Sequence, residues 1–493
     1  MTSFYHRHAG TSNTLAGAVK NAEHEESSAP SALSAVHKIL WAILAFAILL
    51  RLAAALILGD KVVVLPGTFD QISYHTLALR LVSGHGFTFP RLWWPLTRPD
   101  EPTAHWSYLY TLYLAGIYRL FGPHPLIARL LQATLVGFLH PLLAYLLGRR
   151  LFGPRVGLVA AGWTALYPYF VYYSATLMTE PFYITGILAT LYLTMRLAEE
   201  LRRGQAWGWA AGLGMTLAAT VLLRQVFLLF LPFLLIWLGW ATLRTNPNPN
   251  PNPNPNPNPN PNPAPNPARQ PHLILSTAII LALLALFILP FTAYNYARFH
   301  RFVLLNTNAG FAFFWGNHPI YGDHFRSLLP ADGPSYQDLI PPELRSLDEA
   351  AMEKALLKRG IGFIVDDPIR FVRLSITRIP PYFKFWPDPD SAPISNVARV
   401  LSFAAALPFI LIGLFLALRG LWRRCYPQTG PDILLTLVFI LVYSGIHVLT
   451  WTLIRYRLPV DAVLLIYASL ALVTLWHRLR RRFSPSTRLM TEH

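Results

Sequence analysis

Long apolar runs recur along the whole chain, and they constrain its fold more than any other feature of the sequence. They lie near 38–58, 125–147, 156–173, 181–197, 206–222, 225–241, 272–292, 398–418, 432–451 and 458–476. Each run is close to the roughly 20 apolar residues that a helix needs to cross the hydrocarbon core of a bilayer. We therefore predict an all-α polytopic membrane protein with about ten transmembrane helices, or eleven if one further, shorter run also crosses.

The composition is typical of a membrane protein and argues against a soluble or nucleic-acid-binding protein. Charged residues make up 13% of the 493 residues and apolar residues 54%, whereas a soluble domain carries about 25% charged residues. The net charge of +17 is interpreted as short basic loops at an anionic cytoplasmic leaflet, so we expect membrane lipids and no nucleic acid as partners. The single cysteine, Cys425, excludes a disulfide framework and a cysteine metal cluster.

The topology depends on the shorter run, 106–121, which contains four tyrosines and Arg119. If this run does not cross, the loops at Arg149–Arg155, Arg202 and Arg419 and the basic C-terminal tail all fall on one side of the membrane. The positive-inside rule favours that arrangement. We therefore predict that 106–121 is a helix in the outer interface, with both termini in the cytoplasm of a multi-pass plasma-membrane protein.

The spans divide the chain into regions. We expect a disordered cytoplasmic tail at 1–37, an N-terminal transmembrane region at 38–244 with a catalytic outer loop at 59–124, an Asn/Pro cytoplasmic linker at 245–271, a transmembrane helix at 272–292, a small extracytoplasmic segment at 293–396, C-terminal transmembrane helices at 397–476 and a basic cytoplasmic tail at 477–493. In the linker, Pro alternates with Asn and removes every second backbone donor, which predicts an extended spacer.

The extracytoplasmic segment contains two helix-start signals. Ser346-Leu-Asp-Glu349 has the pattern of a capping box, and it predicts an amphipathic helix that runs to about Arg359. Asp367-Pro368 predicts an N-cap and a first-position proline for a second helix. Because Arg370, Arg373 and Arg378 share one face of that second helix, we expect it on the membrane surface.

Two acidic residues at the outer ends of spans are candidate catalytic groups. Asp70 follows the first span, and a carboxylate at the membrane face suits a general base for a hydroxyl. Asp70 would equally serve as an N-cap. Glu180 precedes Pro181 at a helix start; this is also a capping arrangement, but a carboxylate at the bilayer edge is often functional.

Three arginines, Arg224, Arg455 and Arg457, fall on the predicted outer side, against the positive-inside bias. Their planar guanidinium groups suit a phosphate, whereas the alternative is that they snorkel to lipid phosphates. The chain contains no Walker loop, no zinc-spaced His/Cys set and no Gly-x-Ser-x-Gly elbow. The histidines of the outer segments are irregularly spaced, so no metal or other cofactor is assigned, and a divalent metal is not indicated.

Taken in order, these residues resemble the GT-C superfamily of membrane glycosyltransferases, and within it glycosyltransferase family 39, which includes protein O-mannosyltransferases and aminoarabinose transferases. The matching features are Asp70 leading to Tyr74 and Gly84-His-Gly86, Arg119-Leu-Phe-Gly122, Ala128-Arg129-Leu130, Thr179-Glu180-Pro181, Asn306-Thr-Asn308-Ala-Gly310 with Trp315-Gly-Asn317-His-Pro319, and Arg455-Tyr-Arg457-Leu-Pro459. Many relatives have Asp-Glu after the first span. Here the second residue is Gln71, which fits a metal-independent mechanism.

The resemblance implies an enzyme that moves a hexosyl or pentosyl group from a polyprenyl-phosphate donor to a hydroxyl of a lipid, glycan or protein acceptor on the outer face, with inversion. It implies catalytic roles for Asp70 and Glu180. Substrate or phosphate binding would fall to Arg224, Arg455, Arg457, Tyr74, His75 and Asn317. Two alternatives remain: an O-antigen ligase or polymerase, which would not be expected to carry an acid directly after the first span, and a transporter, which would show an internal repeat with broken helices.

Overall fold

The computed structural model describes residues 12–204, 206–244, 269–327, 329, 333–389 and 391–483, with side chains for all of these except 12–33, 269 and 481–483. The described part is helical and contains no strand, only three isolated β-bridges within 88–102. Most of the Asn/Pro linker, 245–268, lies outside the described residues. The all-α prediction is confirmed.

The helices of the membrane region follow the predicted apolar runs. They are α1 (Ser12–Leu58), α4 (Pro125–Phe152), α5 (Pro154–Leu166), α6 (Pro168–Ala175), α7 (Glu180–Arg203), α8 (Trp207–Leu223), the 3₁₀ turn η1 (Gln225–Phe230), α9 (Leu231–Leu243), α10 (Arg269–Phe299), the π-helical turn η4 (Val400–Ala404), α16 (Ala405–Trp422), α17 (Gly430–Leu449) and α18 (Ile454–Phe483).

Seven helical stretches of the described chain are long and apolar enough to cross a membrane. They are Ser34–Leu58, Pro125–Phe152, Gln225–Leu243, Gln270–Phe299, Pro393–Trp422, Gly430–Leu449 and Ile454–Arg480. The other three predicted spans are also helical, but they are shorter or more polar. The run at 156–173 is divided into α5 and α6 because Pro168 lacks the backbone donor that would continue α5. Helix α8 has 17 residues, and α7 ends in a charged turn.

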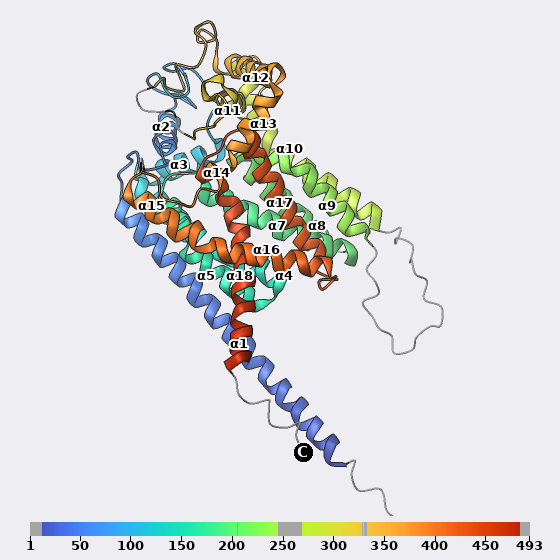
Figure 1. Cartoon of the computed structure of the whole chain (residues 1–493). Coiled ribbons are helices and arrows are strands. Elements are labelled where there is room, and N and C mark those ends of the chain that lie inside the picture. The colour runs from blue at the N-terminus through green and yellow to red at the C-terminus, as the bar shows by residue number, and fades with distance from the viewer. Residues whose placement is uncertain are drawn as a thin grey trace, which may run out of the picture.

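Helix α18 forms the centre of the bundle. In its apolar window 78% of the residues are buried, against 22–56% in the other six spans. It packs against α4, α5, α7, α16 and α17, and the colours of Figure 1 show it running through the middle of the other helices. Its first three residues, 454–456, are partly buried, and the helix is largely buried from Arg457 onward.

The predicted outer segments gather at one end of the molecule (Figure 1). They form α2 (Asp70–Val82), α3 (Tyr108–Phe121), α11 (Asn308–Asn317), α12 (Glu349–Asp366), α13 (Pro368–Thr377), α14 (Ile379–Tyr382), α15 (Pro393–Arg399) and the 3₁₀ turns η2 (Pro319–Tyr321) and η3 (Pro342–Leu344). We call 306–386 the outer lobe. Helix α3 has 14 residues and is roughly 21 Å long at 1.5 Å per residue, which is too short to cross and agrees with the predicted interfacial helix.

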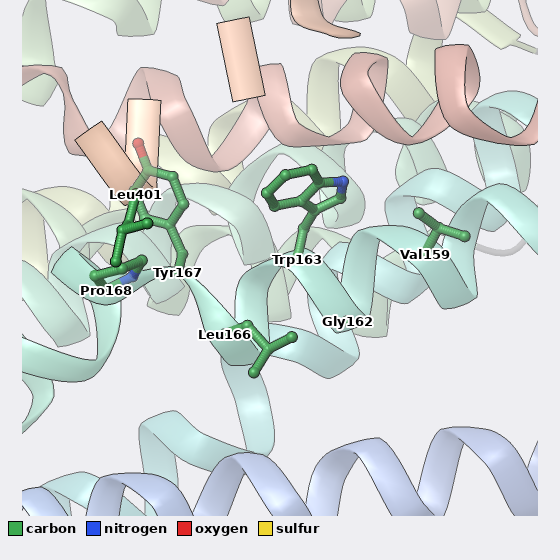
Figure 2. Close-up of a pocket in the computed structure, with 7 residues that line it drawn as sticks. All are labelled: Val159, Gly162, Trp163, Leu166, Tyr167, Pro168 and Leu401. Carbon is green, nitrogen blue, oxygen red and sulfur yellow. The ribbon is translucent and has the colours of Figure 1, made fainter. Parts of the chain in front are cut away.

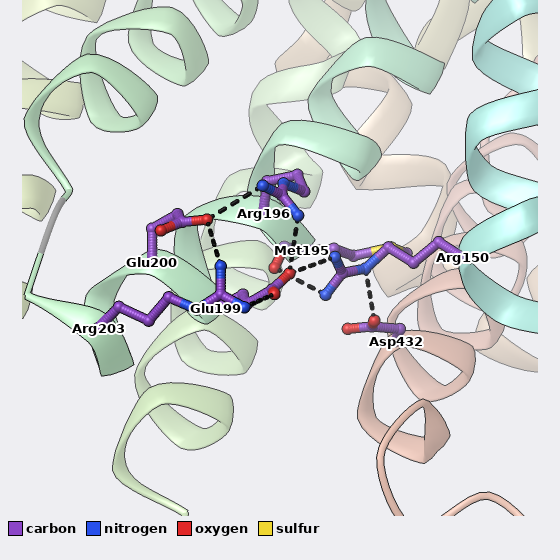
Figure 3. Close-up of polar contacts among 7 residues, drawn as sticks. All are labelled: Arg150, Met195, Arg196, Glu199, Glu200, Arg203 and Asp432. Atoms are coloured by element: carbon purple, nitrogen blue, oxygen red, sulfur yellow. Dashed lines mark hydrogen bonds and ion pairs between the residues drawn. The ribbon is translucent and has the colours of Figure 1, made fainter.

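The basic loops that were predicted to share one side lie together at the opposite end. Figure 3 shows Arg150 at the end of α4 between Glu199 of α7 and Asp432 of α17. Its guanidinium donates to Glu199 Oε2 at 2.8 Å and to Asp432 Oδ2 at 2.7 Å. Arg155 Nη1 lies 2.9 Å from Nε2 of His477, near the end of α18. The predicted order of crossings therefore agrees with the packing.

Two boundaries differ from the sequence prediction. Helix α1 begins at Ser12, so residues 12–37 are helical where a disordered tail was predicted, and 1–11 lie outside the described residues; alanine and glutamate in this stretch favour helix. The cap of α12 is Asp348, not Ser346. The Asp348 carboxylate accepts from the Ala351 amide at 2.8 Å, because the Glu349 side chain is used in buried contacts instead of returning to the cap.

The start of α13 agrees with the prediction. Asp367 accepts from the Arg370 amide at 2.9 Å, and Pro368 is the first helical residue. The arginines of α13 are not all directed to a membrane surface, however. Arg378 is fully buried, Arg370 donates to the Asn317 carbonyl at 2.7 Å, and Arg373 alone is largely exposed.

An apolar hollow of about 510 Å³ lies where α5 gives way to α6 (Figure 2). It is lined by Val159, Gly162, Trp163, Leu166, Tyr167, Pro168 and Leu401. The break at Pro168 separates the two helices and leaves this space between them and η4.

Candidate functional site

Four charged side chains from distant parts of the chain meet at the outer end of the bundle. They are Asp70, Glu180, Arg224 and Arg455, and we call them the charged cluster. Asp70 opens α2, Glu180 opens α7, Arg224 follows α8, and Arg455 is the second residue of α18. The sequence predicted each of these residues as a site candidate, and the structure brings them into contact.

Asp70 accepts a hydrogen bond from Arg455. The distance from Arg455 Nη1 to Asp70 Oδ2 is 2.7 Å, and the Asp70 side chain is 20% exposed. The N-cap position of α2 is Phe69, which makes no side-chain cap bond, so Asp70 does not have the capping role that was the alternative interpretation. Its carboxylate is held by a cation and stays accessible.

Gly67 shapes the loop that carries Asp70. Its φ is +71°, and a Cβ at this position would lie 2.8 Å from the Tyr173 hydroxyl. The left-handed conformation favours glycine at this position. The Gly67 carbonyl also lies 3.4 Å from Arg455 Nη1, so the same loop contributes to the position of this arginine.

Glu180 is buried, with a side chain that is 1% exposed. Its Oε1 lies 2.5 Å from Arg224 Nη2 and 3.9 Å from Arg455 Nε. The start of α7 places the carboxylate at a helix N-terminus, where the helix dipole favours a negative charge. Arg224 also donates through Nε to the Thr179 hydroxyl at 2.9 Å. No role was predicted for Thr179, although its position beside Glu180-Pro181 was the available signal.

Aromatic rings surround the two arginines of the cluster. The Arg224 guanidinium carbon lies 5.5 Å from the ring centre of Tyr183 and 5.6 Å from that of Tyr456, and the guanidinium carbon of Arg455 lies 5.4 Å from Tyr456. Such cation–π contacts hold a guanidinium in place without neutralising it. Tyr456, between Arg455 and Arg457, was not predicted. The two carboxylate and two guanidinium side chains of the cluster give it a formal net charge of zero.

Tyr74 lies near the cluster and is buried against the rings of Trp106 and Tyr110. Burial, together with the nearby Asp70 carboxylate, raises the pKa of Tyr74. His105, which the sequence analysis placed among the irregular outer histidines, packs on Trp106 and Phe311. Burial lowers the pKa of His105 to about 4, although Asp70 opposes this shift. Both side chains are therefore neutral near pH 7.

Arg457 does not reach the charged cluster. It is fully buried; its Nε donates to Asp461 Oδ1 at 2.8 Å and its Nη1 to the Tyr382 carbonyl at 2.9 Å. Residues two apart on a helix point about 200° apart, so Arg455 and Arg457 face opposite sides of α18. Asp461 also accepts from the Tyr167 hydroxyl at 2.7 Å. Arg457 thus belongs to a separate buried ion pair.

His75 and Asn317 also lie in other contacts. His75 Nδ1 is 2.8 Å from the Tyr118 hydroxyl on α3. The Asn317 side chain is buried; its Oδ1 accepts from Arg378 at 2.9 Å and its Nδ2 donates to the Phe313 carbonyl at 2.9 Å. Across the described ranges, no group of three or more His, Cys, Asp or Glu side chains is placed to hold a metal ion.

Comparison with known proteins identifies the fold. Residues 105–250 match the family described as dolichyl-phosphate-mannose-protein mannosyltransferase. No curated protein sequence matches the chain. The structure is similar to the oligosaccharyltransferase AglB from Archaeoglobus fulgidus, solved in complex with an inhibitory peptide and a dolichol-phosphate, with TM-score 0.52, 16% identity, 90% of this chain covered and 51% of that one. A looser match is ArnT from Cupriavidus metallidurans in the apo state, with TM-score 0.36, 15% identity, and 92% and 82% of the two chains covered.

The match to AglB confirms the predicted polytopic fold, and the family match over 105–250 agrees with the resemblance that the motifs indicated. The chain has the polytopic GT-C fold, and it spans about half the length of the archaeal oligosaccharyltransferase. The matched family segment contains Glu180 and Arg224, whereas Asp70 and Arg455 lie outside it.

Proposed function

We propose that this chain, with its GT-C fold, is a glycosyltransferase of the plasma membrane that moves a hexosyl or pentosyl group from a polyprenyl-phosphate donor to an acceptor hydroxyl. The observation that carries the proposal is the convergence of Asp70, Glu180, Arg224 and Arg455 at one end of the bundle. The mannosyltransferase family match over 105–250 supports it, as does the dolichol-phosphate complex of the similar archaeal enzyme.

The charged cluster contains both chemical groups that such a transfer needs. A base must take the hydroxyl proton of the acceptor, and cations must hold the phosphate of the leaving group. Asp70, the more exposed of the two acids, is the base that we propose. Arg224 and Arg455 are the phosphate ligands that we propose, because a guanidinium binds phosphate oxygens through two parallel hydrogen bonds.

The ion pair between Arg455 and Asp70 implies that the donor phosphate binds before the acceptor hydroxyl is activated. Arg455 donates to Asp70 Oδ2, so this carboxylate oxygen is occupied while the ion pair is intact. A donor phosphate competes with Asp70 for Arg455 and releases the carboxylate as it binds. Donor binding therefore precedes activation of the acceptor.

In the transfer step, Asp70 takes the proton of the acceptor hydroxyl while the oxygen of that hydroxyl forms a bond to the anomeric carbon of the sugar. The bond from this carbon to the phosphate oxygen breaks on the opposite face, so the configuration inverts. The electron pair stays with polyprenyl phosphate, which leaves between Arg224 and Arg455. No general acid is needed because the phosphate is already a stable anion.

Glu180 and Thr179 hold Arg224 in place for this step. The Glu180 side chain is 1% exposed, and its Oε1 lies 2.5 Å from Arg224 Nη2 and 3.9 Å from Arg455 Nε. Its role in the proposal is therefore to fix the phosphate-binding arginines. The acceptor is a hydroxyl of a lipid, a glycan or a protein at the outer membrane face.

The test compares wild-type protein with Asp70→Asn in proteoliposomes that contain undecaprenyl-phosphate-linked and dolichyl-phosphate-linked hexoses and pentoses. Release of the polyprenyl phosphate and transfer of the sugar are followed by mass spectrometry. Loss of the base should lower the rate by about 10²–10⁴-fold. Asp100→Asn is the matched control, because Asp100 lies in the same outer loop, is 68% exposed and contacts Arg80 instead of the cluster. Full activity in Asp70→Asn would rule out the assignment of the base.

A further inference from the structure

Arg378 is a fully buried cation at the junction of α13 and α14. Its guanidinium donates to the Val448 and Leu449 carbonyls at 3.2 Å each, to the Asn317 side-chain oxygen at 2.9 Å, and to the Gly316 carbonyl. None of the hydrogen bonds or ion pairs of Arg378 in the described chain involves an acidic side chain, and burial lowers the pKa of Arg378 to about 10. A charge that is buried without a counter-ion is costly, so its place in the fold requires a reason.

The acceptors of Arg378 supply that reason. Val448 and Leu449 are the last two residues of α17, and the final carbonyls of a helix have no partner within the helix. They also form the negative end of the helix dipole, where a cation is favoured. Arg378, from the outer lobe, therefore caps the C-terminus of a membrane helix.

The turn that follows, 450–453, is held by further contacts with the outer lobe. A Cβ on Gly316 would lie 2.2 Å from the Thr450 carbonyl, so the backbones of α11 and the turn are in direct contact. The Trp451 ring packs against Trp315 at 5.7 Å and against Tyr336 at 4.8 Å between ring centres. Helix α18 begins directly after this turn, and its second residue is Arg455.

We infer that Arg378 is a positioning residue: by fixing the end of α17 and the turn 450–453 against the outer lobe, it places Arg455 between Asp70 and Glu180. This inference rests on the proposed function, in which Arg455 binds the donor phosphate. It also gives Asn317 a different role from the predicted one, because its side-chain oxygen holds Arg378. The outer lobe thereby controls the phosphate site through one buried cation.

The first arm of the test measures binding of undecaprenyl phosphate and dolichyl phosphate to the purified full-length protein by native mass spectrometry. Arg378→Gln and Gly316→Ala should each weaken binding by about tenfold, the second without changing any charge. The control is Arg373→Gln, which removes an exposed arginine of α13 whose side chain donates to Asp323. The double variant Arg378→Gln/Arg455→Gln should bind no more weakly than Arg455→Gln alone, because residues that act through one another are not additive.

The second arm measures hydrogen exchange at the backbone amides of 450–456, which needs no ligand. Exchange should be faster in Arg378→Gln and Gly316→Ala than in wild type and in Arg373→Gln. Unchanged exchange, or binding losses of Arg378→Gln and Arg455→Gln that add, would overturn the inference. If Arg378→Gln does not fold, Gly316→Ala decides both arms. A wild type that binds neither lipid phosphate while the exchange behaves as expected would contradict the proposed function and leave the positioning role supported.

Discussion

Arg455 and Arg457 show how far a single side chain depends on its place in the helix. Both lie in the same short motif of the sequence, and both were predicted to bind a phosphate. The structure directs Arg455 to the accessible Asp70 and Arg457 to the buried Asp461. Sequence alone could not separate them, since the direction of each side chain depends on the residue at which α18 begins and on how α18 rotates within the bundle.

The two arginines should therefore give opposite results when each is replaced by alanine. Arg457→Ala leaves Asp461 buried without its cation, which costs about 3–5 kcal/mol of stability. Arg455→Ala leaves an Asp70 side chain that is 20% exposed, so its stability cost should be smaller than that of Arg457→Ala, while donor binding is lost. Thermal unfolding in detergent, together with polyprenyl-phosphate binding, distinguishes the two. A stable Arg457→Ala protein that cannot bind the donor would instead return Arg457 to the phosphate site.

At the scale of elements, Glu349 explains how α12 is attached to the rest of the outer end. The side chain is 7% exposed. It accepts from the Ala104 amide at 2.8 Å and from the Thr307 and Thr97 hydroxyls at 2.6 and 2.8 Å. Two segments far apart in the chain, the outer loop at 97–104 and the region of Thr307, thus donate to one carboxylate of α12.

Glu349→Ala should destabilise the outer lobe by about 1–3 kcal/mol for each buried donor that it leaves unpaired. The expected result is an earlier unfolding transition and faster proteolysis within 293–396, with the transmembrane helices still resistant. The control is Glu343→Gln, because Glu343 is 61% exposed and pairs only with Arg359. Equal proteolysis of the two variants would show that the Glu349 contacts do not hold the lobe.

Among the elements, the predicted apolar runs are helical, and seven stretches of the described chain are long and apolar enough to cross a membrane; the predictions that rest on short polar patterns are confirmed only in part. The apolar runs all became helices because the bilayer allows an isolated span no other way to satisfy its backbone. The cap of α13 was found at Asp367, whereas the cap of α12 moved from Ser346 to Asp348. The difference is that Glu349, the residue that would complete the capping box, makes long-range contacts with Thr97 and Thr307 that no local pattern reveals.

At the scale of the whole molecule, the charged cluster and the arginine-rich loops lie at opposite ends of one bundle. The cluster draws on α2, α7, α18 and the residue after α8, and the opposite end joins α4, α7 and α17 through Arg150. The sequence predicted this separation because 106–121 was interpreted as interfacial. A crossing there would place the Arg149–Arg155 loop opposite the C-terminal tail. What the sequence could not supply was the contact of Asp70 with Arg455, since spans far apart in the chain must pack before these residues meet.

The single cysteine offers a direct test of this arrangement. Cys425 is exposed in the short loop between α16 and α17, beside Arg423 and Arg424, and the positive-inside rule predicts that this loop is cytoplasmic. In intact cells, a membrane-impermeant maleimide should leave Cys425 unlabelled and should label it only after permeabilisation. Cys425→Ser combined with Ser83→Cys is the matched variant, because Ser83 is exposed at the end of α2, and it should be labelled from outside. Labelling of Cys425 in intact cells would place the charged cluster on the cytoplasmic face and would contradict a donor bound at the outer leaflet.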